Sequence, residues 1–152
     1  MSLKMEAASL QKTKDRIKQH EGCVLKIYDD PLLGSAAPTI FYGHLCVPSD
    51  PWEAGQIYTM DDAERVFEED FDIASETADK FIGDVDVPDT VRSIVIEVSF
   101  NIGEPRLMGF RLMRSAIQDQ DYVEAARQLK DSKLYRQLSN RYDPLIEEMS
   151  NA

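Results

Sequence analysis

The alternation of apolar and polar residues divides the chain into a mixed first third and a helical remainder. Residues 8–20 carry a few apolar side chains among many charges, which predicts one exposed helix that ends at Gly22, a favourable residue just past a helix. Two short runs, 24–28 and 39–42, are rich in β-branched and aromatic residues, and turn residues separate them. These runs predict an irregular β-hairpin.

The chain beyond residue 58 has the helical period. Thr59 and Asp62 have the spacing of a capping box, and the apolar residues behind them predict a helix over about 60–82. The strongly apolar stretch 91–102 predicts a central core helix that Gly103 closes. Further helices are predicted from apolar positions in three segments, at 107–117, at 122–129 and, as one or two helices, at 133–149.

These elements predict an α+β, mostly helical fold with two lobes in one domain of 152 residues. We expect a small N-terminal α+β lobe with the β-hairpin at about 14–58 and a long connecting helix at about 60–82. A helical C-terminal lobe at about 88–150 is expected to pack with the first helix.

Composition narrows the possible functions. The chain has 17 Lys and Arg against 28 Asp and Glu, a net charge of −11, which argues against binding to nucleic acid. The apolar runs are too short to span a membrane, and the polar N-terminus gives no indication of a signal peptide. Cys23 and Cys46 are too few for a disulfide scaffold and lack metal-site spacing, so we expect free thiols and no metal or other cofactor.

Three polar residues in the first third are candidates for chemistry. Glu21 stands where the first helix ends, Asp30 follows nine residues later in a turn, and Thr39 begins the second strand-like run. A hairpin that folds back against the end of a helix can bring these three side chains to one cleft. Taken alone, each also fits an ordinary structural role: a solvent-exposed helix end, a turn aspartate and a strand residue.

The same region carries a resemblance to a known family. The segments His20–Asp30 and Thr39–Leu45 resemble the phage-type lysozymes of glycoside hydrolase family 24, the T-even phage branch in particular. The resemblance is collinear from about residue 16 to 142. It continues in Asp62–Phe67, Ser99–Glu104, Met108–Phe110, Glu124–Ala126, Ser132–Tyr135 and Gln137–Arg141.

The resemblance implies a muramidase that cleaves the β-1,4 bond between N-acetylmuramic acid and N-acetylglucosamine in peptidoglycan. Such a reaction needs a protonated acid at the leaving oxygen and an anionic group across the ring. The resemblance implies Glu21 as the general acid, Asp30 as the ionised partner and Thr39 as the residue that positions a water. It favours inversion, although the sequence does not give the separation of the carboxyl groups.

The resemblance also implies supporting residues. Arg141 matches a position where a guanidinium lies behind the catalytic glutamate, although taken alone it could be a surface arginine. Four residues match positions around the sugar cleft: Leu45, Phe100, Asn101 and Gln137. Phe100 can equally be a core residue at the end of an apolar helix.

Two further residues are expected to have structural roles. For His44 we expect a buried ion pair with Asp70 on the long helix. Trp52 could stack on a sugar, but it more readily anchors the proline-bearing loop.

The chain departs from the family pattern in four places. The turn at 31–38 is longer, Phe41 occupies a family glycine, the stretch 46–58 is shorter, and the net charge is acidic where family members are commonly basic. These departures motivate an alternative: a module of the same fold that binds peptidoglycan or a protein partner and hydrolyses little. An acidic helical interaction protein unrelated to glycans is a third possibility.

The leading interpretation is a monomeric phage or prophage endolysin. It would be made in the host cytoplasm and would reach the cell wall with the help of a holin-like permeabilising partner. Its substrate would be the glycan strands of peptidoglycan, with no nucleic acid bound and no insertion into a membrane.

Overall fold

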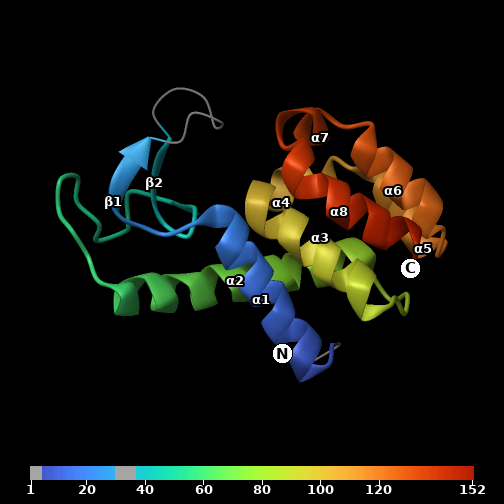
Figure 1. Cartoon of the computed structure of the whole chain (residues 1–152), viewed down its shortest axis with the longest axis horizontal. Coiled ribbons are helices and arrows are strands. Elements are labelled where there is room, and N and C mark those ends of the chain that lie inside the picture. The colour runs from blue at the N-terminus through green and yellow to red at the C-terminus, as the bar shows by residue number, and fades with distance from the viewer. Residues whose placement is uncertain (1–4, 30–36) are drawn as a thin grey trace. The chain divides into compact units, whose positions relative to one another are not determined.

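The computed structural model describes residues 5–29 and 37–152 and divides the chain into two compact units (Figure 1). The sheet-bearing unit comprises Asp15–Asp72, and the helical unit comprises Met1–Lys14 with Ile73–Ala152. Two helices, α1 (Ala7–Glu21) and α2 (Met60–Ile82), have residues in both units. The prediction of an α+β, mostly helical fold is confirmed.

The sheet-bearing unit contains an antiparallel sheet of three strands in the order β1, β2, β3. Strand β1 is Val24–Asp29, β2 is Pro38–Phe41 and β3 is His44–Leu45. Val24 pairs with Phe41 and Tyr28 pairs with Thr39, so β1 has two extra residues between these pairs. The predicted hairpin is therefore present and irregular, as the sequence indicated.

Phe41 combines a strained backbone with a buried ring. Its backbone has φ 59°, in the left-handed region that glycine adopts without strain and that costs other residues about 1–2 kcal/mol. The Phe41 ring is 1% exposed and meets Trp52 edge-to-face, with the ring centroids 4.9 Å apart. Tyr58 completes this aromatic cluster, at 4.9 Å from Trp52. Burial of the ring offsets the backbone strain.

The aromatic cluster includes Trp52. Its ring packs against Phe41, Tyr58 and the Arg65 guanidinium, and it is only partly exposed. The expectation that Trp52 anchors the proline-bearing loop is confirmed.

Helix α2 begins as the capping-box pattern predicted. The Asp62 amide donates to Thr59 Oγ1 at 3.2 Å, and the Thr59 amide donates to Asp62 Oδ2 at 3.3 Å. The two side chains therefore satisfy each other's backbone amides. Behind this cap Ala63, Val66 and Phe67 are buried.

The helical unit is built around α3 (Asp89–Ile102), in which nine consecutive residues from Val91 to Ser99 are buried. Helix α8 (Ser139–Ser150) packs against α3 and α6 (Tyr122–Lys130), and α5 (Arg111–Gln118) packs against α6. The short helices α4 (Glu104–Met108) and α7 (Lys133–Gln137) complete the unit (Figure 1). The prediction that α3 is the core helix is confirmed.

One prediction about the helical unit is wrong. The apolar positions at 107–117 predicted one helix, but the structure has α4 and α5 with a break at Gly109 and Phe110. The amides of both break residues donate to the third residue before them, which tightens the turn, and Phe110 has a non-helical ψ of 62°. The apolar spacing continues across the break because Leu107 of α4 and Met113, Ala116 and Ile117 of α5 are all buried.

Within the described residues, no helix combines the length and the apolar character needed to cross a membrane.

Candidate active site

Glu21 is the last residue of α1, and its environment is set by two glycines. Gly22 has φ 67° and ends the helix, with its amide donating to the Lys18 carbonyl at 3.0 Å. Gly43, with φ 70°, lies between β2 and β3. A Cβ atom at Gly43 would be 2.5 Å from Glu21 Oε1, so the carboxyl group lies directly against the backbone of this turn. The Glu21 side chain is partly buried.

Thr39 lies in β2, where it pairs with Tyr28 of β1 and Leu45 of β3. It is completely buried, and its hydroxyl donates to the Ala37 carbonyl at 2.9 Å. Leu45, in contrast, is 49% exposed. The sheet thus makes neighbours of two residues that were assigned to the cleft.

Asp30 lies outside the described residues, as does most of the turn at 31–38. Its position relative to Glu21 and Thr39 therefore stays a prediction. Asp29, the residue before it, ends β1 and pairs with Pro38, next to Thr39.

A polar network that the sequence did not indicate adjoins Glu21. Glu64 of α2 pairs with the Lys18 ammonium of α1, and it accepts a hydrogen bond of 2.9 Å from the Tyr42 hydroxyl. The Lys18 ammonium also lies 4.7 Å from the centroid of the Phe67 ring. Lys18 and Glu64 are 46 residues apart, and no local spacing reveals such a contact.

The network shifts two ionisations. The Lys18 hydrogen bond is the main cause that lowers the pKa of Glu64, with a further contribution from Tyr42. Desolvation first, and then the hydrogen bond to Glu64, raise the pKa of Tyr42 to about 12. Glu64 is therefore charged and the Tyr42 hydroxyl is a donor throughout the pH range in which most proteins are stable.

The expected ion pair between His44 and Asp70 is present, although it is partly and not fully buried, and His44 has a second carboxylate partner. Its Nδ1 lies 2.7 Å from Asp70 Oδ2 on α2, and its Nε2 lies 2.8 Å from Asp50 Oδ2 in the loop after β3. The hydrogen bond to Asp70 is the largest cause that raises the pKa of His44 to about 9, and burial partly opposes it. Between two carboxylates the imidazole is doubly protonated at neutral pH. Asp50 was missed because the loop has no periodic pattern.

The helical unit holds four more of the assigned residues. Asn101, near the end of α3, accepts a hydrogen bond of 2.7 Å from the Tyr142 hydroxyl of α8. Arg141 Nε donates to Glu97 Oε2 at 3.3 Å, and this carboxylate is fully buried. Phe100 is partly exposed, and Gln137 of α7 is exposed. The four residues lie on α3, α7 and α8, but no described contact tests the assignment of Phe100, Asn101 and Gln137 to a sugar cleft or of Arg141 to the orientation of Glu21.

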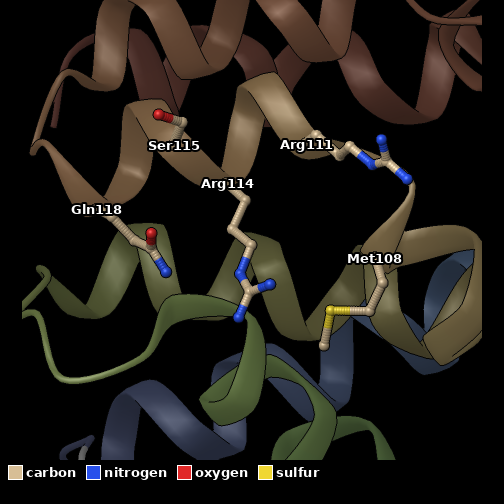
Figure 2. Close-up of a pocket in the computed structure, with 5 residues that line it drawn as sticks. All are labelled: Met108, Arg111, Arg114, Ser115 and Gln118. Carbon is tan, nitrogen blue, oxygen red and sulfur yellow. The ribbon is translucent and has the colours of Figure 1, made fainter.

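An open cavity of about 510 Å³ lies beside α5 (Figure 2). Arg114 extends from α5 toward the end of α2, where it donates to the carbonyls of Phe81 at 2.9 Å and Lys80 at 3.1 Å. A cation that binds the last carbonyls of a helix stabilises the helix end. This arginine therefore has a structural role that accounts for its position in the cavity wall.

Neither metal ligation nor a disulfide is supported in the described part of the chain. No group of three His, Cys, Asp or Glu residues there could hold a metal ion. Cys23 and Cys46 are free thiols. Cys23 directly precedes β1 at the Phe41 end of β2, whereas the Cys46 amide bonds to Pro38 at the other end. Strand geometry puts them roughly 10 Å or more apart, beyond disulfide reach.

The structure is that of a mostly helical α+β protein. In it a glutamate at a helix end lies against a turn of a small antiparallel sheet. Residues 18–142, most of the chain, match the family model for phage lysozyme. The chain belongs to the phage lysozyme family, whose members are lysozyme-type hydrolases of cell-wall peptidoglycan. A search of curated proteins found no match.

Proposed function

We propose that this chain is an endolysin that hydrolyses the β-1,4 bond between N-acetylmuramic acid and N-acetylglucosamine in peptidoglycan. The observation that carries the proposal is the Glu21 carboxyl group at the end of α1, against the Gly43 turn and within the matched residues 18–142. A partly buried carboxyl group on a rigid helix end has the placement that a general acid needs.

In the proposed mechanism Glu21 protonates the glycosidic oxygen as the bond breaks. Asp30 stays ionised and supports the positive charge that develops on the sugar or activates the attacking water. Thr39 positions that water. For Thr39 this role requires its hydroxyl to exchange the Ala37 carbonyl for the water, because the hydroxyl is buried in the described structure.

The decisive experiment measures reducing ends released from purified peptidoglycan. Glu21→Gln keeps the shape of the side chain and removes the acid, so we expect activity to fall at least about 100-fold. Glu69→Gln is the matched control, since Glu69 is an exposed glutamate of α2 that pairs only weakly with Arg65, at 3.5 Å. Equal activity in wild type and Glu21→Gln would contradict the proposal.

The net charge of −11 gives a second test. Peptidoglycan carries carboxylates, so the enzyme and its substrate repel each other at long range. We expect clearance of permeabilised Gram-negative cells to increase as salt rises from about 10 to 150 mM, because salt screens the repulsion. We further propose that a holin-like permeabilising partner gives the enzyme access to the wall in cells.

The buried Thr39 hydroxyl favours one alternative, a lysozyme-fold module that binds glycan strands with little hydrolysis. Sedimentation with insoluble peptidoglycan separates the two functions. Binding without released reducing ends, equal in wild type and Glu21→Gln, would favour the module.

A further inference from the structure

Glu64 connects the two structural elements that surround Glu21. One of its carboxylate oxygens pairs with the ammonium of Lys18 on the last turn of α1. The other accepts the hydroxyl of Tyr42 at 2.9 Å, where β2 gives way to the Gly43 turn. A single side chain of α2 therefore bonds the helix end and the turn at the same time.

Both partners of Glu64 are next to Glu21. Lys18 precedes Glu21 by three residues on α1, so the two side chains leave neighbouring positions of the helix. Tyr42 directly precedes Gly43, the residue whose backbone lies against the Glu21 carboxyl group. A shift of either partner would move one of the two surfaces that hold this carboxyl group.

Aromatic packing restricts the network further. The Tyr42 and Phe67 rings meet edge-to-face with their centroids 5.4 Å apart, and the Lys18 ammonium lies over both rings, at 5.5 and 4.7 Å. An isolated surface ion pair contributes little to stability. Here the Lys18 side chain is only 24% exposed. Its position is fixed both by the Glu64 carboxylate and by the contacts with the two rings.

We propose that Glu64 is a positioning residue for catalysis: it fixes Lys18 and Tyr42, and through them it holds Glu21 in its reactive orientation. This inference rests on the proposed function, in which Glu21 is the acid. Loss of a positioning residue lowers the rate of the chemical step but changes substrate binding little, because small displacements of a reacting group are costly.

The test compares Tyr42→Phe and Glu64→Gln with the control Glu69→Gln. Tyr42→Phe removes only the hydroxyl, and Glu64→Gln removes the charge that holds Lys18. With a soluble glycan oligomer we expect kcat to fall about 5- to 20-fold in both variants. KM should stay within about twofold, the acidic limb of the pH profile should shift, and the control should match wild type.

Two results would overturn the inference: an unchanged kcat in both variants, or a loss of activity equal to the loss of folded protein in a melting curve. If wild type releases no reducing ends at all, the proposed function fails, and a second measurement then decides the inference. Carbon-13 NMR follows the titration of the Glu21 carboxyl group. A titration curve that differs between wild type and Tyr42→Phe supports positioning by the network, and identical curves overturn it.

Discussion

The two units of the molecule are stabilised in different ways. The helical unit buries nine consecutive residues of α3, and its two buried charges there are paired, Arg92 with Asp79 and Glu97 with Arg141. Among its described residues, the sheet-bearing unit has a buried cluster around the sheet, formed by Ile40, Phe41, Ala63 and Val66, and it also buries Ile17, Phe67 and Phe71. It adds an aromatic cluster, the doubly paired His44 and the Glu64 network. Apolar burial is the main stabilising contribution in the helical unit, whereas charged and aromatic contacts supplement a smaller core in the sheet-bearing unit.

This comparison predicts that the stability of the helical unit depends little on pH. Ile94 of α3 is fully buried, and Ile94→Ala removes three carbon atoms from a packed core. We expect the free energy of unfolding to fall by about 2–5 kcal/mol, with a similar loss at pH 6 and pH 9. Urea denaturation at both values is the measurement. A loss below about 1 kcal/mol would mean that the core around α3 can collapse.

The sheet-bearing unit should respond to pH through His44. Its pKa is about 9 in the folded chain and 6.5 in the absence of partners, so folding favours the protonated form. The contribution is complete below pH 6.5 and is lost as pH rises through about 9, and it amounts to about 3 kcal/mol at most. Desolvation raises the pKa of Asp50, but the hydrogen bonds from Val47 and His44 together outweigh it, so the pKa is lowered. The contribution of Asp50 to the stability of the fold is therefore lost under acid conditions.

The measurement is urea denaturation of wild type and His44→Gln between pH 5 and pH 10. We expect the difference in unfolding free energy between them to shrink at alkaline pH. Parallel curves over the whole range would show that the imidazole is not held by its two carboxylates.

Gly43→Ala tests the contact with Glu21 directly. The added methyl group meets Glu21 Oε1 and also forces a left-handed backbone on alanine, for a combined cost of about 2–3 kcal/mol. Gly55→Ala is the control because Gly55 has φ 85° and no atom within 4 Å of the new methyl group. The Gly55→Ala variant should lose about 1 kcal/mol of unfolding free energy from backbone strain alone and keep its activity. Equal losses would contradict a close contact at Gly43.

The smallest expected effect concerns the cap of α2. Thr59→Ala removes the oxygen that accepts the Asp62 amide, and we expect a loss of about 1 kcal/mol. Thermal melting measures it, and hydrogen exchange of the first-turn amides shows whether the loss is local. A variant as stable as wild type would show that water replaces the cap without cost.

The sequence predicted the elements that depend on local patterns. Helical spacing located α2 and α3, the Thr59 and Asp62 pair located a helix start, and Gly22 and Gly103 located helix ends. The break at Gly109 was missed because apolar periodicity continues through it. Of the candidate site, motif order indicated Glu21 and Thr39, and the pairing of His44 with Asp70 was expected. The contacts of Glu64 and Asp50 join segments with no common pattern, so only the fold reveals them.

The segment between β3 and α2, residues 46–59, has neither helix nor strand, yet it is attached to the surrounding structure at three residues. Asp50 bonds to His44, and the Trp52 ring packs against Phe41. The Tyr58 amide donates to the Leu25 carbonyl at 2.8 Å. The longest stretch between these attachments is 53–57, so a protease that needs a longer extended segment can cut here only after at least one attachment breaks. Cleavage in this segment should therefore report unfolding of the surrounding unit rather than motion of a loop.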